Sequence, residues 1–494
     1  MNKLLKISIW AMIPVLMVGC KKDYLVTNPS NDVVNTLIFE NTTNAKTALE
    51  GMYRITFSHA PAVGYGGGAL HSDFGQKAYD IVNDLMGNDM VVHSQGYGWF
   101  NRDYQYTELL NTDNNRRPFM IWAYYGVLIN NANNIIVNID KATGPAAEKE
   151  SMKGQALAMR AYSYYNLVNY FQQTYKGNED KKGVPLYLIP AQKGLPRGTV
   201  KQNYDQIIAD LTAAELLLTG KPAEAKSHID VRVVQGIRAR VALVMEDWVN
   251  ASKYAALART GYTPMPSTTY TAGFNTTTNP EWMWGATVIV PEATIFASFF
   301  SHMDANAFDY AQLGGQKKIT KDLYDQINAA DIRKTLFRTP GTGTTTFPDY
   351  CQNKFRLANP SSWAGDYLFM RAGEMYLIEA EALSRQGQDA PARTALQTLV
   401  QARYPAYSAA SFSGPALLAE ILFQRRVELW GEGFGWFDLK RLKLGLNRPT
   451  GAGNHGAFNP GQTVLPAGDN LFAYKICQKE FDTNLTFTPL DQNP

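Results

Sequence analysis

The sequence predicts a mainly α-helical protein in which helical hairpins form a scaffold that carries one long irregular insertion. Segments with apolar residues at helical spacing recur along the chain, and several follow one another in pairs. From residue 262 to about residue 360 the chain is instead rich in Thr, Asn, Gly and Pro, with few helical periods. The chain has 494 residues, 45% of them apolar and 18% charged, so it is long enough to bury a large core.

The expected helices have the apolar spacing of one buried side. In chain order they cover residues 45–57, 118–140, 148–172, 197–218, 231–260, 366–385 and 390–403. The stretch 231–260 is expected to form two helices joined as a hairpin, with Gly261 ending the second one. In the helix at 148–172, the small residues Ala156 and Ala161 would let a neighbouring helix approach closely.

Two of these segments follow the pattern of a tetratricopeptide hairpin. Gly373 and Tyr376 have the Gly-x-x-Tyr spacing of its first helix. The pattern of its second helix is matched by Trp248, Ala251, Tyr254, Ala255 and Ala258. We therefore expect a tetratricopeptide-like α-solenoid, interrupted by the irregular loops and short strands of the insertion.

The stretch from Pro415 to Arg448 predicts a helix, a glycine hinge and a second helix. Its charged residues lie beside apolar ones and are Arg425, Arg426, Glu428, Glu432 and Asp438. We interpret them as structural ion pairs between helices, and the helix at 366–385 offers Arg371, Glu374, Glu379 and Glu381 as partners for Arg425 and Arg426. The alternative is a general acid–base pair of Glu428 and Glu432, which lie one helical turn apart.

The first residues resemble the signal peptide of a bacterial lipoprotein. Lys3 and Lys6 precede an apolar run at 7–18 that is too short to span a bilayer. The run ends in Met17-Val18-Gly19-Cys20, which is similar to a lipobox and makes Cys20 the expected lipidated residue. We expect a signal peptide at 1–19 and a polar tether at 20–34; a plain secretory peptide is the alternative.

The stretch RRVELWGEGFGWFDLKRL, residues 425–442, resembles the C-terminal signature of the SusD/RagB family of outer-membrane nutrient-binding lipoproteins. Gly435 stands where that signature usually has an arginine, and Gln424 where it often has an acid. Further similar motifs extend over nearly all of the mature chain. The resemblance implies a helical scaffold at 35–261 with a loop insertion near 58–106, a ligand-binding insertion at 262–365, and a C-terminal helical region at 366–494.

The same resemblance implies a surface lipoprotein of the outer membrane. Such a protein binds an oligosaccharide and delivers it to a SusC-like TonB-dependent transporter, so the expected partners are glycan, transporter and membrane. A peptide ligand is the alternative within the family, and a lipid-anchored glycosidase is the alternative from another class.

Candidate ligand residues are chosen for their chemistry, because aromatic planes stack on sugar rings while amides bond to hydroxyl groups. They are Tyr97, Trp99, Asn101 and Trp282. The segment 93–106, which contains the first three, could equally place its aromatic rings in the core. Trp282 shares a face with Trp284 if residues 279–284 are extended, and either indole could be buried.

Several functions lack support in the sequence. The six histidines form no His-Glu-x-x-His motif, and neither a Gly-x-Ser-x-Gly motif nor a phosphate-binding loop is present. We therefore expect no catalytic residue, no metal and no cofactor, and no acidic loop with calcium-binding spacing is found. The net charge of +3 without a basic run argues against nucleic acid. Cys351 and Cys477 either pair or remain as two buried thiols.

Overall fold

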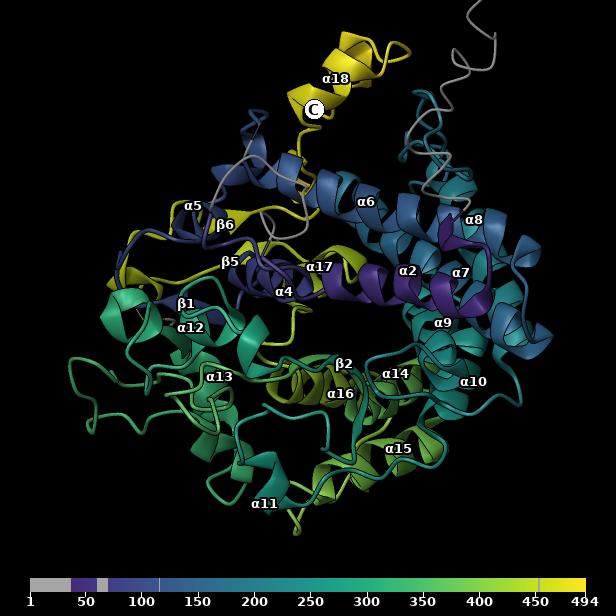
Figure 1. Ribbon diagram of the computed structural model, residues 1–494. Coiled ribbons are helices and arrows are strands. Elements are labelled where there is room, and N and C mark those ends of the chain that lie inside the picture. Colours follow the sequence, from purple (N-terminus) through teal and green to yellow (C-terminus); the bar gives the residue numbers. More distant parts are fainter. Residues whose placement is uncertain (1–36, 60–69, 115, 452–453) are drawn as a thin grey trace, which may run out of the picture.

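The computed structural model describes residues 37–59, 70–114, 116–451 and 454–494. The expected signal peptide and tether, including Cys20, lie outside the described residues. The main body is helical, as Figure 1 shows. Its longer helices are α2 (Thr42–Ile55), α4 (Gln76–Leu85), α6 (Arg117–Asn138), α7 (Ala146–Phe171), α8 (Val200–Leu218), α9 (Val231–Met245), α10 (Trp248–Arg259), α14 (Ala372–Arg385), α15 (Asp389–Gln401), α16 (Gly414–Glu428) and α17 (Gly435–Arg441).

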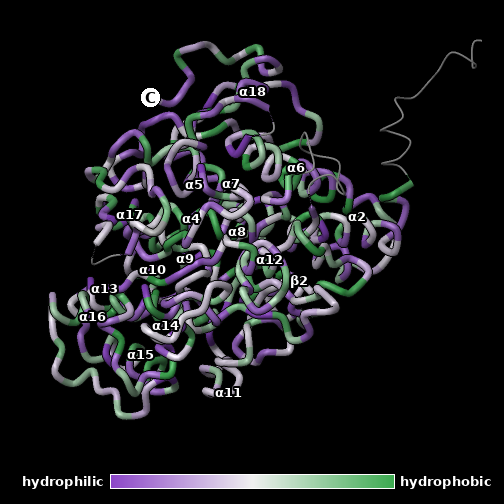
Figure 2. The backbone as a smooth tube through the Cα atoms, turned by 90° about the vertical axis from the view of Figure 1, so that its left-hand side faces the viewer, coloured by the Kyte–Doolittle hydropathy of each residue, from purple (hydrophilic) through white to green (hydrophobic). Residues whose placement is uncertain are grey.

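These helices pack against their neighbours in chain order. Each helix from α6 to α10 contacts the next one, α10 contacts α14, and α14 contacts both α15 and α16. Hydrophobic and hydrophilic residues alternate along the helical segments in Figure 2, as expected where one side of each helix is buried. The predicted mainly α fold class is confirmed.

Local sequence explains where the helices begin and end. Thr199 and Gln202 form a reciprocal capping box at the start of α8, with backbone-to-side-chain distances of 2.8 and 3.1 Å. The Asp230 carboxylate accepts from the backbone N–H of Val233 at 2.9 Å and caps α9, a contact that contributes about 1 kcal/mol in typical helices. Gly261 has a φ of 89° just after α10, as expected for a helix-ending glycine.

Small residues let α7 and α8 pack closely. Ala156 and Ala161 in α7 are fully buried. A Cβ atom added at Gly154 in the same helix would lie 2.8 Å from Cγ of Leu218 in α8, closer than carbon atoms pack. A larger side chain at Gly154 would therefore push the two helices apart.

The remaining elements are short. They include α5 (Asn101–Tyr104), α11 (Ser267–Tyr270), α12 (Phe299–Met303), α13 (Lys321–Gln326), α18 (Gln478–Thr483), β1 (Met90–Val92), β2 (Trp282–Ala286), β3 (Lys317–Ile319), β4 (Tyr367–Arg371), β5 (Leu446–Asn447) and β6 (Val464–Leu465). Three antiparallel pairs form: β1 with β3, β2 with β4, and β5 with β6. The first two pairs fasten the region 262–365 to the helical scaffold.

One expected helix begins later than its sequence pattern indicates. Residues 367–371 of the segment 366–385 form β4, and α14 begins at Ala372. All five residues of β4 are buried, and the strand pairs with β2. A short apolar run of this kind fits a buried strand and a buried helix equally well, so periodicity cannot separate the two.

A network of buried ion pairs holds the last helices together. The Arg371 guanidinium, at the end of β4, donates to Glu281 at 2.7 Å, to Glu428 at 2.8 Å and to Glu432 at 2.7 Å. Further cations of the network are Arg333, Lys354 and Arg403. Glu281, Arg371 and Glu428 are fully buried, where a charge is tolerated only if it is paired and hydrogen-bonded.

The expected partners of Arg425 and Arg426 are wrong. Arg425 donates to Asp438 at 2.7 Å, and Arg426 donates to Asp89 at 2.6 Å. The acids of α14 are instead paired with arginines of α9, α10 and α17. These pairs are Glu374 with Arg240, Glu379 with Arg259, and Glu381 with Arg441. The helix spacing predicted charged faces correctly but not which helix each face meets.

Two other expectations concern cysteine and the membrane. Cys351 and Cys477 are buried free thiols, so the two do not pair. Burial raises the pKa of each thiol to about 12, which keeps both protonated at neutral pH. Within the described part of the chain, no helix combines the length and the apolar character needed to span a bilayer.

Candidate ligand-binding site

A loop rich in aromatic residues, 93–100, leaves β1 and is held against the insertion. The backbone N–H of His93 donates to the carbonyl of Gln316 at 3.0 Å, which continues the β1–β3 pairing. The Ser94 hydroxyl donates to the carbonyl of Gly314 at 2.5 Å. Gly98 follows with a φ of 83°, a conformation that favours glycine, and the chain turns so that Tyr97 and Trp99 meet residues of the insertion.

The insertion contributes Phe296 and Tyr310 to the same place. The Tyr310 hydroxyl lies 2.6 Å from Nδ1 of His71, and the buried ring of His302 stacks on Tyr310 at 5.1 Å between centroids. His302 Nε2 lies 2.8 Å from the carbonyl oxygen of His71. Tyr310 is thus held from below by His302 and from the side by His71.

Five rings form a contiguous cluster that we call the aromatic face: His71, Tyr97, Trp99, Phe296 and the buried Tyr310. Tyr310 lies in the middle, 5.1 Å from Tyr97, 6.0 Å from Trp99 and 5.0 Å from Phe296 between ring centroids. His71 is nearly parallel to Phe296, at 6.2 Å and an interplanar angle of 3°, and stacks on Trp99 at 5.5 Å. Such a surface presents flat apolar planes at several angles.

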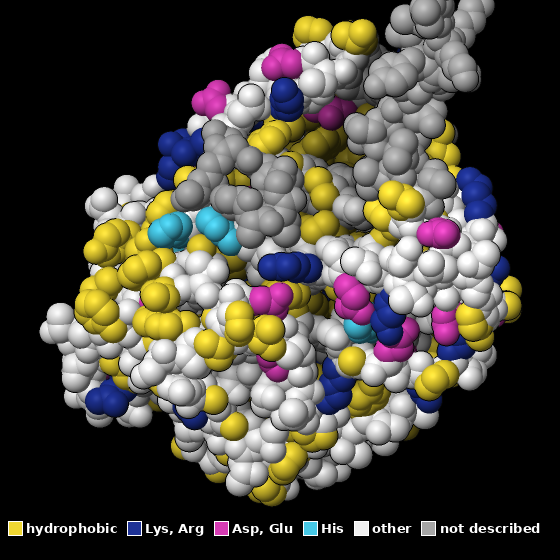
Figure 3. Space-filling model, viewed as in Figure 1, with side chains coloured by type: hydrophobic (Ala, Val, Ile, Leu, Met, Phe, Trp, Pro, Cys, Tyr) yellow, Lys and Arg dark blue, Asp and Glu magenta, His cyan; other side chains and the backbone are white. Residues whose placement is uncertain are grey.

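Part of the aromatic face is open to solvent. Tyr97 is 66% exposed and Phe296 36% exposed, and the nearby Phe308 is 69% exposed. Figure 3 shows histidine side chains beside a gathering of hydrophobic side chains on the left of this view. Exposed apolar side chains gathered in one patch often mark a binding surface.

The aromatic face carries little charge at neutral pH. Burial lowers the pKa of His71, and the neighbouring His59 lowers it further. Burial also lowers the pKa of His302 well below its usual range, and Lys317 adds to this effect. Asp309, next to Tyr310, has its pKa raised to about 9 because it is buried. These groups are therefore mainly neutral, which favours a neutral ligand.

The four predicted ligand residues have different positions. Tyr97 and Trp99 belong to the aromatic face. Asn101 begins α5 beneath it and is buried, and its amide donates to the carbonyl of Gln95 at 2.8 Å, so it shapes the loop. Trp282 is fully buried in β2, opposite Arg371 of β4, and offers no surface to a ligand. The site that we describe therefore leaves Trp282 out.

Sequence reasoning missed three members of the aromatic face: His71, Phe296 and Tyr310. His71 lies far from Phe296 and Tyr310 in the chain, and they meet through tertiary contacts, among them the β1–β3 pairing and the hydrogen bonds of His71 to Tyr310 and His302. The density of aromatic residues between 296 and 310 was a usable signal, since it contains four phenylalanines and a tyrosine in a loop-rich region.

Two family models match different parts of the chain. Residues 72–243 match the model described as starch-binding associating with outer membrane. Residues 338–486 match the model of the SusD family. The chain belongs to the SusD/RagB family. A comparison with curated protein sequences gives no match.

Solved structures of SusD-like proteins have the same fold. A SusD-like carbohydrate binding protein from Bacteroides vulgatus is 26% identical, with a TM-score of 0.80 over 92% of this chain and 99% of that one. The surface glycan-binding protein A from Bacteroides uniformis is 18% identical, with a TM-score of 0.70 over 91% of this chain and 98% of that one. A SusD superfamily protein from Bacteroides thetaiotaomicron has a TM-score of 0.74 at 21% identity, over 92% of this chain and 100% of that one.

The SusD/RagB signature forms the end of α16, the glycine hinge and α17, and its glutamates are structural. Burial alone would raise the pKa of Glu428, but the charges of Arg403, Arg371 and Arg333 hold it well below its usual range. Glu428 is fully buried and Glu432 is 8% exposed, and both are bonded to Arg371. Neither carboxylate is placed to exchange a proton with a ligand, so the general acid–base interpretation finds no support.

Gly435, which stands where the signature usually has an arginine, contacts Asp84 through its backbone. Its N–H donates to the Asp84 carboxylate at 3.0 Å, and the N–H of Gly433 donates to the other oxygen at 2.8 Å. Asp84 is thereby hydrogen-bonded but has no ion-pair partner among the described residues. Burial raises the pKa of Asp84 to about 7. Within the described ranges, no group of three or more His, Cys, Asp or Glu residues is placed to hold a metal ion.

Proposed function

We propose that this protein is a surface lipoprotein that binds a neutral oligosaccharide on the aromatic face. The observation that carries the proposal is the meeting of loop 93–100 with the insertion, which assembles the aromatic face from segments distant in the chain. Sugar rings have apolar faces of C–H groups that stack on aromatic planes, so adjacent rings at different angles suit a chain of sugars.

The charge of the aromatic face supports a sugar over a charged peptide. Neutral His71, together with the buried His302 and the buried, protonated Asp309, places no net charge at the aromatic face. A neutral sugar that covers this face therefore does not have to bury an unpaired ion. The starch-binding family model that matches residues 72–243 and the similar carbohydrate binding protein from Bacteroides vulgatus support this ligand class.

We further propose that the bound glycan is delivered to a SusC-like TonB-dependent transporter in the outer membrane. The protein would be held at the cell surface by acyl chains on Cys20, each buried methylene of which adds about 0.8 kcal/mol to membrane binding. Membership of the SusD/RagB family supports this assignment. Replacing Cys20 by Ala should release the protein from the membrane fraction, and retention there would contradict lipid anchoring.

Calorimetric titration with a set of neutral oligosaccharides tests the binding proposal. Trp99→Ala should weaken binding about tenfold or more, the scale of a central aromatic contact in a binding site. Leu216→Ala is the control, because Leu216 is 79% exposed on α8, across the molecule from α12 in Figure 1. Equal affinity for both variants, or no binding of any glycan by the wild type, would contradict the proposal.

The same titration separates the alternatives. Binding of peptides but not glycans would identify a peptide-binding member of the family. Cleavage of the oligosaccharide, detected by chromatography of the mixture after titration, would instead identify a glycosidase.

A further inference from the structure

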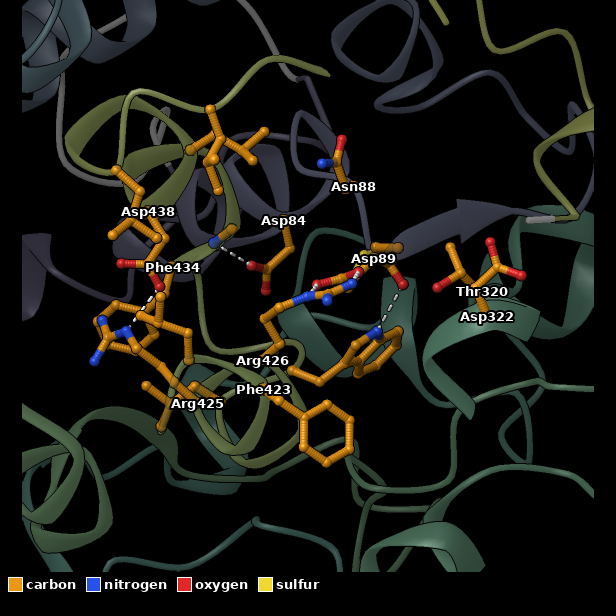
Figure 4. Close-up of a pocket in the computed structure, with 18 of the residues that line it drawn as sticks. Asp84, Asn88, Asp89, Thr320, Asp322, Phe423, Arg425, Arg426, Phe434 and Asp438 are labelled. Atoms are coloured by element: carbon orange, nitrogen blue, oxygen red, sulfur yellow. Dashed lines mark hydrogen bonds and ion pairs between the residues drawn. The ribbon is translucent and has the colours of Figure 1, made fainter. Parts of the chain in front are cut away.

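A cavity of 620 Å³ shares no lining residue with the aromatic face. It is lined by residues of α16, α17, the end of α4 and α13 (Figure 4). Four aspartates and two arginines are among its lining residues: Asp84, Asp89, Asp322, Asp438, Arg425 and Arg426. The aspartates outnumber the arginines, so the cavity is acidic.

Both arginines are already neutralised within this cavity. Arg426 forms two hydrogen bonds to Asp89, at 2.6 and 2.9 Å. Arg425 pairs with Asp438 at 2.7 Å. Asp84 and Asp322 remain, and neither is in an ion pair with a described residue. No cation of the described chain therefore pairs with these two carboxyl groups. Burial raises the pKa of Asp84 to about 7, so this group is partly protonated at neutral pH, and a cationic ligand would favour its ionised form.

Of these two aspartates, Asp84 is the stronger candidate for a cation-binding group, because it is buried. Its carboxylate is fixed by the backbone N–H groups of Gly433 and Gly435, which leave further lone pairs of both oxygens available to donors. Figure 4 shows this carboxylate among the side chains that line the cavity. A buried carboxylate that is oriented by hydrogen bonds but not paired with a cation can bind a cationic ligand without rearrangement.

Gly435 keeps the space beside Asp84 open. A Cβ atom added at Gly435 would lie 3.2 Å from Oδ1 of Asp84, so a side chain at this position would begin alongside the carboxylate. The backbone of Gly435 is not in the left-handed region, and other residues fit its conformation. The position therefore allows an experiment in which the cavity is filled from within.

The other walls suit a planar cation with an apolar stem. Phe423, Trp430 and Phe434 line the cavity together with several leucines. A guanidinium group is planar, stacks on aromatic rings and forms two parallel bonds to a carboxylate, whereas an ammonium group is a compact and strongly hydrated charge. The geometry thus favours guanidinium over ammonium.

One more lining group lacks a partner. Nη1 of Arg425 is buried without a hydrogen-bond acceptor among the described residues, and the side chain is only 4% exposed. A lone guanidinium ion would not satisfy this donor. A peptide would, because its backbone carbonyl groups are acceptors, and the volume of the cavity leaves room for more than one side chain.

We propose that the cavity binds an arginine residue of a peptide segment, with its guanidinium group on Asp84. The bonds involved are charge-assisted hydrogen bonds from the guanidinium N–H groups to the carboxylate, and the arginine stem lies against the aromatic walls. This site is separate from the aromatic face and does not rest on the glycan proposal.

Calorimetric titration of the intact chain with the capped tripeptide acetyl-Gly-Arg-Gly-amide tests the proposal. The tripeptide with citrulline in place of arginine has the same shape without the charge and should bind about tenfold more weakly or not at all, a difference of about 1.4 kcal/mol or more. Methylguanidinium alone should also bind more weakly than the arginine peptide. Equal binding of the arginine and citrulline peptides, or no binding of the arginine peptide at millimolar concentration, would overturn the proposal.

Variants at Gly435 supply the matched pair. G435R places a guanidinium stem in the cavity and should abolish binding of the arginine peptide, while G435A adds only a methyl group and should bind within about threefold of the wild type. Asp84→Asn, which removes the charge, should weaken binding of the arginine peptide about tenfold. If G435R does not fold, the affinity of Asp84→Asn alone tests whether the peptide binds through Asp84. Wild-type affinity in Asp84→Asn, or in a folded G435R, would overturn the proposal.

Discussion

The ion-pair network around Arg371 and the aromatic face illustrate two opposite uses of polar and aromatic side chains. In the network, Glu281, Glu428 and Glu432 are buried, and each is bonded to a cation. On the aromatic face, Tyr97 is mostly exposed, and Nε1 of Trp99 has no hydrogen-bond partner among the described residues. The network is complete without any other molecule, whereas the aromatic face is not.

This difference indicates where stability and where binding reside. A fully paired buried network ties β4, α16 and the hinge into one arrangement, and any change to it leaves an unpaired charge. Exposed rings and unsatisfied polar groups contribute little to folding and are typical of functional sites, where a sequence departs from what stability alone would favour. Substitutions in the two regions should therefore have separable effects.

The largest effect is expected from Arg371→Met. Methionine keeps most of the volume but leaves Glu281, Glu428 and Glu432 without their shared cation, and we expect a loss of about 3–5 kcal/mol in the free energy of unfolding. Urea denaturation followed by circular dichroism measures it.

Arg426→Met is the matched control for that substitution. The side chain of Arg426 is 45% exposed and pairs with Asp89, so its loss should cost less than about 1 kcal/mol. Similar losses for the two variants would mean that burial does not distinguish the network from a surface pair.

Trp282→Ala and Tyr97→Ala should separate folding from binding. Trp282 is fully buried, so its truncation should cost about 3–5 kcal/mol of stability while the glycan affinity of the folded variant is retained. Tyr97 is exposed, so its truncation should change stability by less than about 0.5 kcal/mol and weaken glycan binding. Denaturation and calorimetric titration of both variants measure the two effects, and loss of affinity in folded Trp282→Ala would return Trp282 to the site.

The contrast also explains what could be predicted from the sequence. Helical periodicity is a local property, and the expected helix at 148–172 corresponds closely to α7 at Ala146–Phe171. The SusD/RagB signature likewise lies within one continuous stretch. Such features need no knowledge of which elements meet.

The aromatic face could be predicted only in part. Tyr97 and Trp99 stand in one glycine-rich loop whose composition is visible in the sequence. His71, Phe296 and Tyr310 join them only through tertiary contacts such as the β1–β3 pairing and the His71–Tyr310 hydrogen bond. Trp282 is a candidate for its chemistry, and strand alternation places it on one face with Trp284, yet alternation does not tell which face is buried. In the structure a register shift lies between the two tryptophans, and both are buried.

A smaller and pH-dependent effect is expected at Asp309. The residue is fully buried beside Tyr310, its Oδ1 accepts from the N–H of Ala311 at 3.2 Å, and its Oδ2 has no partner among the described residues. Burial, with a contribution from Asp304, raises its pKa from 3.8 to about 9 in the folded protein. The folded state therefore holds this proton in a pH range where the unfolded chain has released it.

The sign of the effect follows from that difference. Between pH 4 and 9 the folded state binds more protons at this site, so the site's contribution to the free energy of unfolding falls as pH rises, by at most about 1.4 kcal/mol per pH unit. Asp309→Asn keeps an acceptor for Ala311, places an amide where the protonated oxygen lies, and cannot ionise. Urea denaturation at pH 5, 6, 7 and 8 measures the free energy of unfolding of both proteins. The value for Asp309→Asn should increase relative to that of the wild type as pH rises. Parallel profiles would mean that Asp309 is ionised in the folded protein, and the aromatic face would then carry a negative charge that disfavours a neutral sugar.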